Sequence, residues 1–203
     1  MDTPQPAERR LIINADDFGL TEGVNRAVLE LNTAEVVPSA TLMATGRAFR
    51  EAVHSAFVQT SLGVGCHVVL VDGRPELHPA ELPTLAPEGR LRSSLTTFMV
   101  DLFGGRIASR EIEREAIAQI RQLQSAGITV THLDTHKHTH LAPPVLDAVA
   151  RLGLGAAHAD AEGAGRHSGY AEYAGTAQRR ATGKCRPHSM PPIEFLPGGG
   201  ARV

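Results

Sequence analysis

The chain has 203 residues, 42% of them hydrophobic, which is enough for one domain with a core of its own. Its 20 basic and 22 acidic residues give a formal charge of -2, so no global positive field would attract nucleic acid or an anionic membrane. The first ten residues lack the apolar core of a signal peptide, and no later stretch is long and apolar enough to span a bilayer, so a cytoplasmic protein is expected.

Short apolar runs alternate with helix-like periodicity in the first part of the chain. Residues 11–13 are expected to form a buried strand that ends in a polar cluster at residues 14–17. Thr21 can cap the next helix, whose apolar positions recur at spacings of three and four. The third strand contains His67, which is out of place among apolar neighbours, and glycines that let another group pack closely. The expected elements are strands at 11–13, 39–45 and 62–70 and helices at about 22–34 and 48–57.

The segment from Val71 to about Ser94 is rich in proline, glycine and charge. It is too long for an ordinary connection, so we expect a functional loop that forms a wall for a substrate. Beyond it, Ser109 is expected to cap a helix over residues 110–125, and Gly127 supplies the stop. A strand at 128–133 and a helix at 143–152 then complete a fourth strand–helix unit. This alternation predicts an α/β fold with a parallel sheet that is part of a barrel.

The composition changes after Gly153, where alanine, glycine, arginine, histidine and proline dominate. The sequence therefore divides into residues 1–153, the recognisable strands and helices, and an atypical tail at 154–203. Such a composition is typical of a disordered tail. The alternative is that the tail is a wrong-frame translation of a GC-rich gene, since a barrel with four units should continue with a fifth.

Polar residues interrupt the sequence at the carboxyl end of three predicted parallel strands. They are Asp16 and Asp17 after the first strand, His67 in the third, and the cluster from His132 to His140 after the fourth. Because the carboxyl ends of parallel strands converge on one face, these side chains can meet around one site. Carboxylate and imidazole ligands together suit a divalent cation. Two histidines and one aspartate would leave positions open for water and substrate, as in a catalytic metal site.

Each polar interruption also has a simpler explanation. Asp16 and Asp17 can cap a turn, and His67 can be a hydrogen-bonded core histidine. The cluster has period two, so an extended backbone would place its members on one face, as in a surface tract that scavenges metal ions. Convergence of three strand ends favours a shared metal site over these separate explanations. The members of the cluster are His132, Asp134, His136, His138 and His140.

Three segments resemble the successive signature motifs of the YdjC-like family, which includes chito-oligosaccharide deacetylases and deacetylases associated with hopanoid biosynthesis. They are residues 10–20 (RLIINADDFGL), 65–67 (GCH) and 131–140 (THLDTHKHTH), and the resemblance covers residues 10 to about 153. Residues 70–75 (LVDGRP) and the His-Lys-His-x-His form of the third motif are closer to the hopanoid-associated branch.

The resemblance implies a distorted TIM-like (β/α) barrel, incomplete here after the fourth strand–helix unit, and hydrolysis of an acetamido group on an amino sugar. Carried over by position, Asp17, His67 and His136 would hold one divalent metal ion, Mg²⁺ or Zn²⁺, and Asp16 would be the general base. Family members usually have a later His-Pro motif, whereas residues 187–188 read Pro-His. His138 or His140 would then replace the missing general acid.

Three other interpretations of the sequence stay open. A different metallohydrolase, such as a phosphoesterase, would use similar ligands but usually needs a second metal or a basic phosphate clamp. A truncated remnant could bind metal or carbohydrate without catalysis. A metal-buffering protein would bind several ions weakly, whereas a defined site holds one. An unclosed sheet would also expose strand edges and invite pairing with another copy of the chain.

Overall fold

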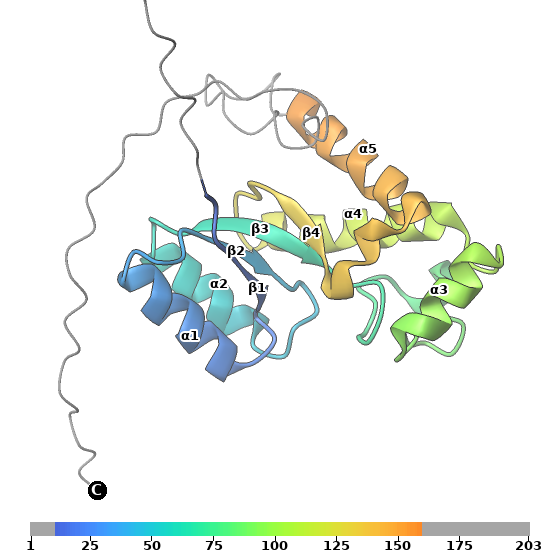
Figure 1. Ribbon diagram of the computed structural model, residues 1–203, viewed down its shortest axis with the longest axis horizontal. Helices are drawn as coiled ribbons and strands as arrows, with labels where there is room; N and C mark the ends of the chain where they lie inside the picture. The colour runs from blue at the N-terminus through green and yellow to red at the C-terminus, as the bar shows by residue number, and fades with distance from the viewer. Residues whose placement is uncertain (1–10, 160–203) are drawn as a thin grey trace, which may run out of the picture.

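The computed structural model describes residues 11–159, with side chains placed through residue 152. Within this range strands alternate with helices, as the sequence predicts (Figure 1). The elements in chain order are β1 (Asn14–Phe18), α1 (Glu22–Thr33), β2 (Ser39–Leu42), α2 (Phe49–Val58), β3 (Gly63–Val68), η1 (Pro79–Glu81), α3 (Leu95–Phe103), α4 (Ser109–Ser125), β4 (Leu133–Thr135), η2 (His136–Leu141) and α5 (Pro143–Ala159).

The four strands form one parallel sheet in the order β1-β2-β3-β4. In a flat sheet, β1 and β4 would lie about 14 Å apart, three strand spacings of about 4.8 Å. Here the Asn14 side chain on β1 lies 3.0 Å from the His132 ring and 3.5 Å from the Asp134 carboxylate at β4. The sheet is therefore strongly curled, and the side chains of its two end strands meet on its concave face.

The two faces of the curled sheet differ completely in chemistry. On the convex face, apolar side chains are buried against the helices, where α1 packs on α2 and β1, and α4 packs on β3 and α5. The concave face carries polar side chains that hydrogen-bond to one another. Convex residues include Ala40, Leu42, Val64, Cys66 and Val68. Concave residues include Asn14, Asp16, Ser39, Thr41, His67 and Asp134.

The prediction of close packing at the β3 glycines is confirmed at Gly65. A Cβ atom there would lie 2.6 Å from the ring of His132, so a side chain at this position would displace the ring from the concave face. Cys66, the next residue, points to the opposite face and is buried. Burial, followed by the negative charge of Asp134, raises the pKa of its thiol. Cys66 is therefore a small core residue.

The prediction of a buried strand at residues 11–13 is wrong. The structure begins β1 at Asn14, and Leu11, Ile12 and Ile13 are exposed. Asn14 pairs with Ser39, and the residue before Ser39 is Pro38, which has no N–H to donate to the ladder. The apolar run therefore lies just before the paired part of the strand.

Other boundaries shift where local chemistry differs from the pattern. The Thr21 hydroxyl caps α1 by accepting from the Val24 N–H, as predicted. Ser109 is instead the first residue of α4, and Ala108 occupies the cap position. Regular pairing of the fourth strand begins at Leu133, later than expected. Helix α5 continues beyond residue 152 to Ala159 and so crosses the expected boundary at 153, whereas residues 160–203, most of the predicted tail, lie outside the described part.

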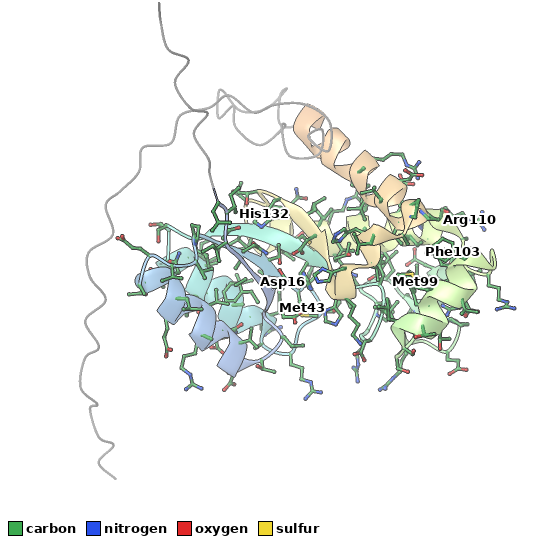
Figure 2. All side chains as sticks on the ribbon, in the orientation of Figure 1. Asp16, Met43, Met99, Phe103, Arg110 and His132 are labelled. Carbon is green, nitrogen blue, oxygen red and sulfur yellow. The ribbon has the colours of Figure 1, made fainter. Side chains whose placement is uncertain are left out.

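Helix α3 has no counterpart among the predicted elements. Its Met99 and Phe103 lie at one end of the molecule, away from Asp16 on β1 (Figure 2). Ser94 caps it by accepting from the Thr97 N–H. Among the described residues, no helix combines the length and apolar character that crossing a membrane requires.

The long segment after β3 is held against α4 by three buried polar side chains. Glu111, Glu115 and Gln119 lie at successive helical turns of α4 and are at most 2% exposed. Their oxygens accept backbone N–H bonds of 2.7 to 3.1 Å from Val69, Glu76, Leu77, Thr84 and Leu85. These bonds satisfy the backbone of an irregular segment and fix its course beside the carboxyl ends of the strands.

Candidate metal centre

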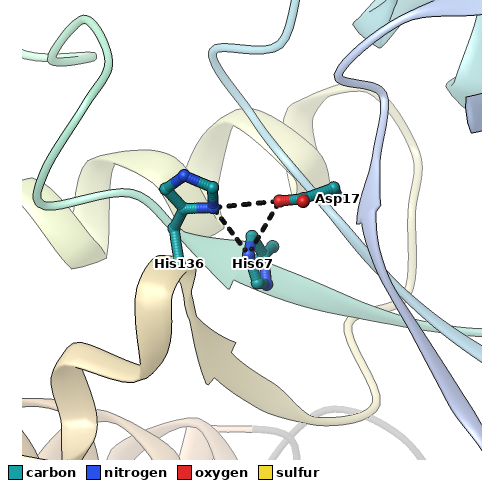
Figure 3. A group of neighbouring side chains, drawn as sticks. All are labelled: Asp17, His67 and His136. Atoms are coloured by element: carbon teal, nitrogen blue, oxygen red, sulfur yellow. Dashed lines mark hydrogen bonds and ion pairs between the residues drawn. The ribbon is translucent and has the colours of Figure 1, made fainter.

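Three predicted ligand residues meet at the carboxyl end of the sheet (Figure 3). Asp17 comes from β1, His67 from β3, and His136 is the first residue of η2 directly after β4. Asp17 Oδ1 lies 3.2 Å from His67 Nε2 and 2.9 Å from His136 Nδ1, and the two ring nitrogens lie 3.3 Å apart. The structure thus brings together residues that are far apart in the sequence, as predicted from the three strand ends.

The donor set fits a divalent cation. Ligand atoms about 2.1 Å from an ion lie about 3.0 Å apart in octahedral and about 3.4 Å apart in tetrahedral geometry. The three separations here, 2.9, 3.2 and 3.3 Å, are close to these values. A carboxylate oxygen and two imidazole nitrogens converge on one point, and their lone pairs repel unless a cation or a proton lies between them. Asp17 is 34% exposed, so the same point is open to solvent on one side.

His67 is oriented by a carboxylate behind it. Its Nδ1–H donates to Asp134 Oδ1 at 2.6 Å, which leaves the lone pair of Nε2 facing Asp17 and His136. A carboxylate that holds the second ring nitrogen of a ligand histidine fixes the tautomer and raises the basicity of the ligand atom. Thr41 supports the carboxylate in turn by donating its hydroxyl to Asp134 Oδ2 at 2.9 Å.

The electrostatics of this pair follow from its burial and its contacts. Burial opposes charge on the His67 ring, but the hydrogen bond to Asp134 and the charges of Asp134, Asp17 and Asp16 outweigh it, and the pKa of His67 is raised. Burial likewise opposes charge on Asp134, yet hydrogen bonds from His67 and Thr41 lower its pKa. Asp134 is therefore an anion held in place for His67.

The Asn14 side chain connects Asp16, the expected general base, to Thr41. Its side-chain N–H groups lie 2.9 Å from Asp16 Oδ1 and 3.2 Å from Thr41 Oγ1. Its oxygen accepts from Ser39 Oγ at 2.8 Å and lies 3.0 Å from His132 Nε2. The polar side chains of the concave face thus form one connected network.

The remaining predicted site residues are placed differently. Asp16 is exposed and lies beside the triad of Asp17, His67 and His136. With His67 and Asp134 it forms a second, overlapping group of possible ligands. His138 and His140 belong to neither of these two groups. Their rings pack against each other edge to face, with the ring centroids 5.9 Å apart. The alternative of an extended His132 to His140 cluster with one common face does not apply to this structure, because η2 begins at His136 and Lys137 and His138 adopt left-handed conformations.

Sequence reasoning gave no site role to Asp134, Thr41 or Asn14. Asp134 lies at spacing two from His136 in the cluster, so on a strand the two side chains share a face, which is a usable signal. Thr41 and Asn14 carry a weaker one, since each is a polar residue at an alternate position of a short strand. A hollow of about 470 Å³ lies beside the start of α2, and the triad residues are not among those that line it.

Comparison with known proteins agrees with these motifs. The family described as YdjC-like protein matches residues 10–188 and extends beyond the quoted motifs. Over 144 residues the chain is 40% identical to a carbohydrate deacetylase of Brevibacillus brevis and 42% identical to one of Geobacillus stearothermophilus, covering 70% and 71% of this chain. The aligned part is 55% and 56% of those proteins, so the chain spans a little over half of their length.

A solved structure shares the fold. It is that of an Enterococcus faecalis V583 protein described as a cellobiose-phosphate cleavage protein, at 29% identity and a TM-score of 0.65 over 73% of this chain and 57% of that one. The curled parallel sheet described above is consistent with that fold. From the family match and the curated relatives together, the chain belongs to the YdjC-like protein family.

Proposed function

We propose that the chain carries the metal centre of a carbohydrate N-deacetylase, a hydrolase that removes the acetyl group from an acetylated amino sugar. The observation that carries this proposal is the convergence of Asp17, His67 and His136 on one point that is open to solvent, with Asp16 beside it. The names of the curated relatives support sugar deacetylation. The dependence on one divalent ion, Mg²⁺ or Zn²⁺, rests on the donor set.

The residues present match the demands of amide hydrolysis. At this site a divalent ion would supply polarisation of the acetamide carbonyl and a lowered pKa for a water. Asp17, His67 and His136 hold it, and Asp134 keeps His67 in the ligating tautomer. Asp16 takes the proton of the attacking water. The Asn14 side chain orients Asp16 by donating a hydrogen bond to its Oδ1 at 2.9 Å.

The leaving amine also needs a proton as the carbon–nitrogen bond breaks. His138 or His140 supplies it, so that acetate and the free amine are the products. Their place directly after the ligand His136 supports this role. Thr135 holds His140 through contacts of 2.9 Å to the ring Nδ1 and to the backbone N–H.

The proposal extends to the fold and the substrate branch. A curled sheet with helices on its convex face and a polar concave face supports assignment to a distorted TIM-like (β/α) barrel. The segment at residues 70–75 supports an amino sugar linked to a hopanoid-type lipid, with chito-oligosaccharides as the other substrate class. Acetate release from N-acetylglucosamine, its short oligomers and an N-acetylglucosaminyl lipid separates these substrates.

A second function is binding of metal or carbohydrate without catalysis, which would use Asp17, His67 and His136 but needs neither a base nor a proton donor. The chain spans a little over half the length of its curated relatives. Metal binding with no acetate release from any of the three substrates would select this function over the deacetylase.

The variant Asp16→Asn tests the deacetylase directly. The ligands stay in place, so the variant is expected still to bind one ion. Acetate release is expected to fall by about a hundredfold or more, because the general base is lost. Metal content and acetate release are measured on the same preparation, and full activity in Asp16→Asn would eliminate Asp16 as the base.

A further inference from the structure

An ion pair joins the segment after β3 to the turn that carries the ligand His136. Lys137 Nζ lies 2.6 Å from Asp72 Oδ2, close enough for a charge-assisted hydrogen bond. Lys137 directly follows His136, and Asp72 lies in the segment that continues from the strand of His67. The pair therefore links the backbone of one metal ligand to the backbone that follows another.

The turn held by this pair has an unfavourable backbone conformation. Lys137 and His138 have φ angles of 54° and 53°, and Asp72 has a φ of 55°. Side chains disfavour this left-handed region, and two such residues in succession persist only where tertiary contacts hold them. Asp17, itself a proposed ligand, has a φ of 60°. Four of the five non-glycine residues with positive φ in the described chain thus lie in or next to the site.

Asp72 stands on a fixed support. Its backbone N–H donates to the Arg92 carbonyl at 2.7 Å. The Arg92 guanidinium in turn donates to Asp101 and to the carbonyls of Thr84 and Leu85. The buried side chains of α4 also hold the same segment, at Glu76 and Thr84. The ion pair therefore fixes the Lys137 turn to a rigid part of the molecule.

His136 is sensitive to the position of this turn because of the nitrogen it uses. It directs Nδ1 toward Asp17 and His67. Nδ1 is the ring nitrogen nearer the backbone, so a displacement of the main chain moves the ligand atom almost directly. A shift of well under 1 Å would spoil ligand separations of about 3 Å.

We propose that Asp72 and Lys137 are positioning residues that clamp the left-handed turn after β4 and so set His136 for metal binding. The inference rests on the proposed metal centre and adds to it two residues that are not ligands. Residues that hydrogen-bond to metal ligands typically contribute tenfold to a hundredfold to metal affinity. The same size of effect is expected for the clamp.

The two single variants separate positioning from a plain field effect. If the pair acted only through its charges, Lys137→Met would strengthen cation binding by leaving the Asp72 carboxylate unopposed, and Asp72→Asn would weaken it. A clamp predicts that both variants weaken binding to a similar degree and that the double variant is no weaker than either single one.

The experiment is a titration of the full chain with Co²⁺, which reports ligand geometry through its visible spectrum, followed by competition with Zn²⁺. Asp72→Asn and Lys137→Met are expected to weaken binding tenfold or more and to alter the spectrum. Lys137→Arg preserves the pair and is expected to keep affinity within about threefold. Glu81→Gln is the matched control. Glu81 lies in the same segment as Asp72, and its ion pair with Arg114 is about as exposed as the pair of Asp72 with Lys137. Its loss should leave both the affinity and the spectrum unchanged.

Urea unfolding of the metal-free variants checks that the chain still folds. Unchanged metal affinity in both single variants, or affinity changes of opposite sign in the two, would overturn the clamp. The metal centre would still be supported in that case, provided that metal binding is lost in His67→Ala. If the unmodified chain binds no ion, or if His67→Ala binds as tightly, the metal centre fails and the clamp fails with it. If one single variant does not fold, metal affinity is measured instead in Lys137→Arg and in the double variant Asp72→Lys with Lys137→Asp, which exchanges the two charges. Affinity close to that of the unmodified chain in both supports the clamp, and loss of affinity in both overturns it.

Discussion

Alternate residues of the same strands lie on the convex and concave faces of the curled sheet. Those on the convex face pack in the core, and those on the concave face build the candidate site. On β2, Leu42 is fully buried in the core, while its neighbour Thr41 holds the carboxylate behind His67. On β3, Cys66 and His67 divide in the same way. A one-residue spacing thus separates the residues that stabilise the fold from those that build the site, and changes on the two faces should be distinguishable by measurement.

The largest expected effect on stability is on the convex face. Leu42→Ala removes a fully buried side chain and should lower the free energy of unfolding by about 2–5 kcal/mol. The metal affinity of the folded fraction should stay within about threefold of the unmodified chain. Urea unfolding and Co²⁺ titration measure the two quantities, and a large loss of affinity with little loss of stability would break the division between the faces.

The next effect lies on the concave face. Asp134→Asn removes the carboxylate that orients His67 and should weaken metal binding tenfold to a hundredfold. Stability should change less than in Leu42→Ala, because the amide can still hydrogen-bond to Thr41. Isothermal titration with Zn²⁺ gives the affinity. Binding as tight as in the unmodified chain would mean that the polar network does not tune the ligands.

How far the sequence predicts this molecule depends on the kind of signal involved. The meeting of the regions around Asp17, His67 and His136 was predictable because each region interrupts an apolar pattern at a strand end, and parallel strands bring such ends together. The choice of Asp17 over Asp16, and of His136 within its cluster, rested on the family resemblance. The left-handed turn at Lys137 was not predictable, since nothing in a run of alternating histidines marks the change from extended to positive φ. The exposed run at residues 11–13 was misread for a similar reason, because hydrophobic pattern alone does not reveal where pairing starts.

The polar side chains buried under the long segment show a second limit. Glu111, Glu115 and Gln119 follow the helical period of a solvated face, and local pattern favours exposure. They are buried because an irregular segment lies over them and supplies backbone N–H groups, which is a tertiary fact. Asp134 could be found by its spacing from His136, whereas its partner Thr41 is on another strand.

The smallest expected effect lies outside both faces, at Asp101 on α3. Hydrogen bonds from Arg92 and Arg106 hold the pKa of Asp101 below its usual value. A depressed folded-state pKa contributes stability above the unfolded pKa, and this contribution is lost as the pH falls through the folded value. Asp101→Asn should therefore be slightly less stable at neutral pH and match the unmodified chain in strong acid. Urea unfolding across this range tests it, and an equal gap at every pH would contradict the assignment.

The number of ions bound per chain tests the metal centre most directly. After exhaustive dialysis at neutral pH, elemental analysis should find one divalent ion per unmodified chain and none in His67→Ala or His136→Ala. The double variant His138→Ala with His140→Ala should keep the ion, because neither residue is among the triad ligands. Several weakly held ions that the double variant loses, or one ion retained in both single variants, would contradict a metal centre built from Asp17, His67 and His136.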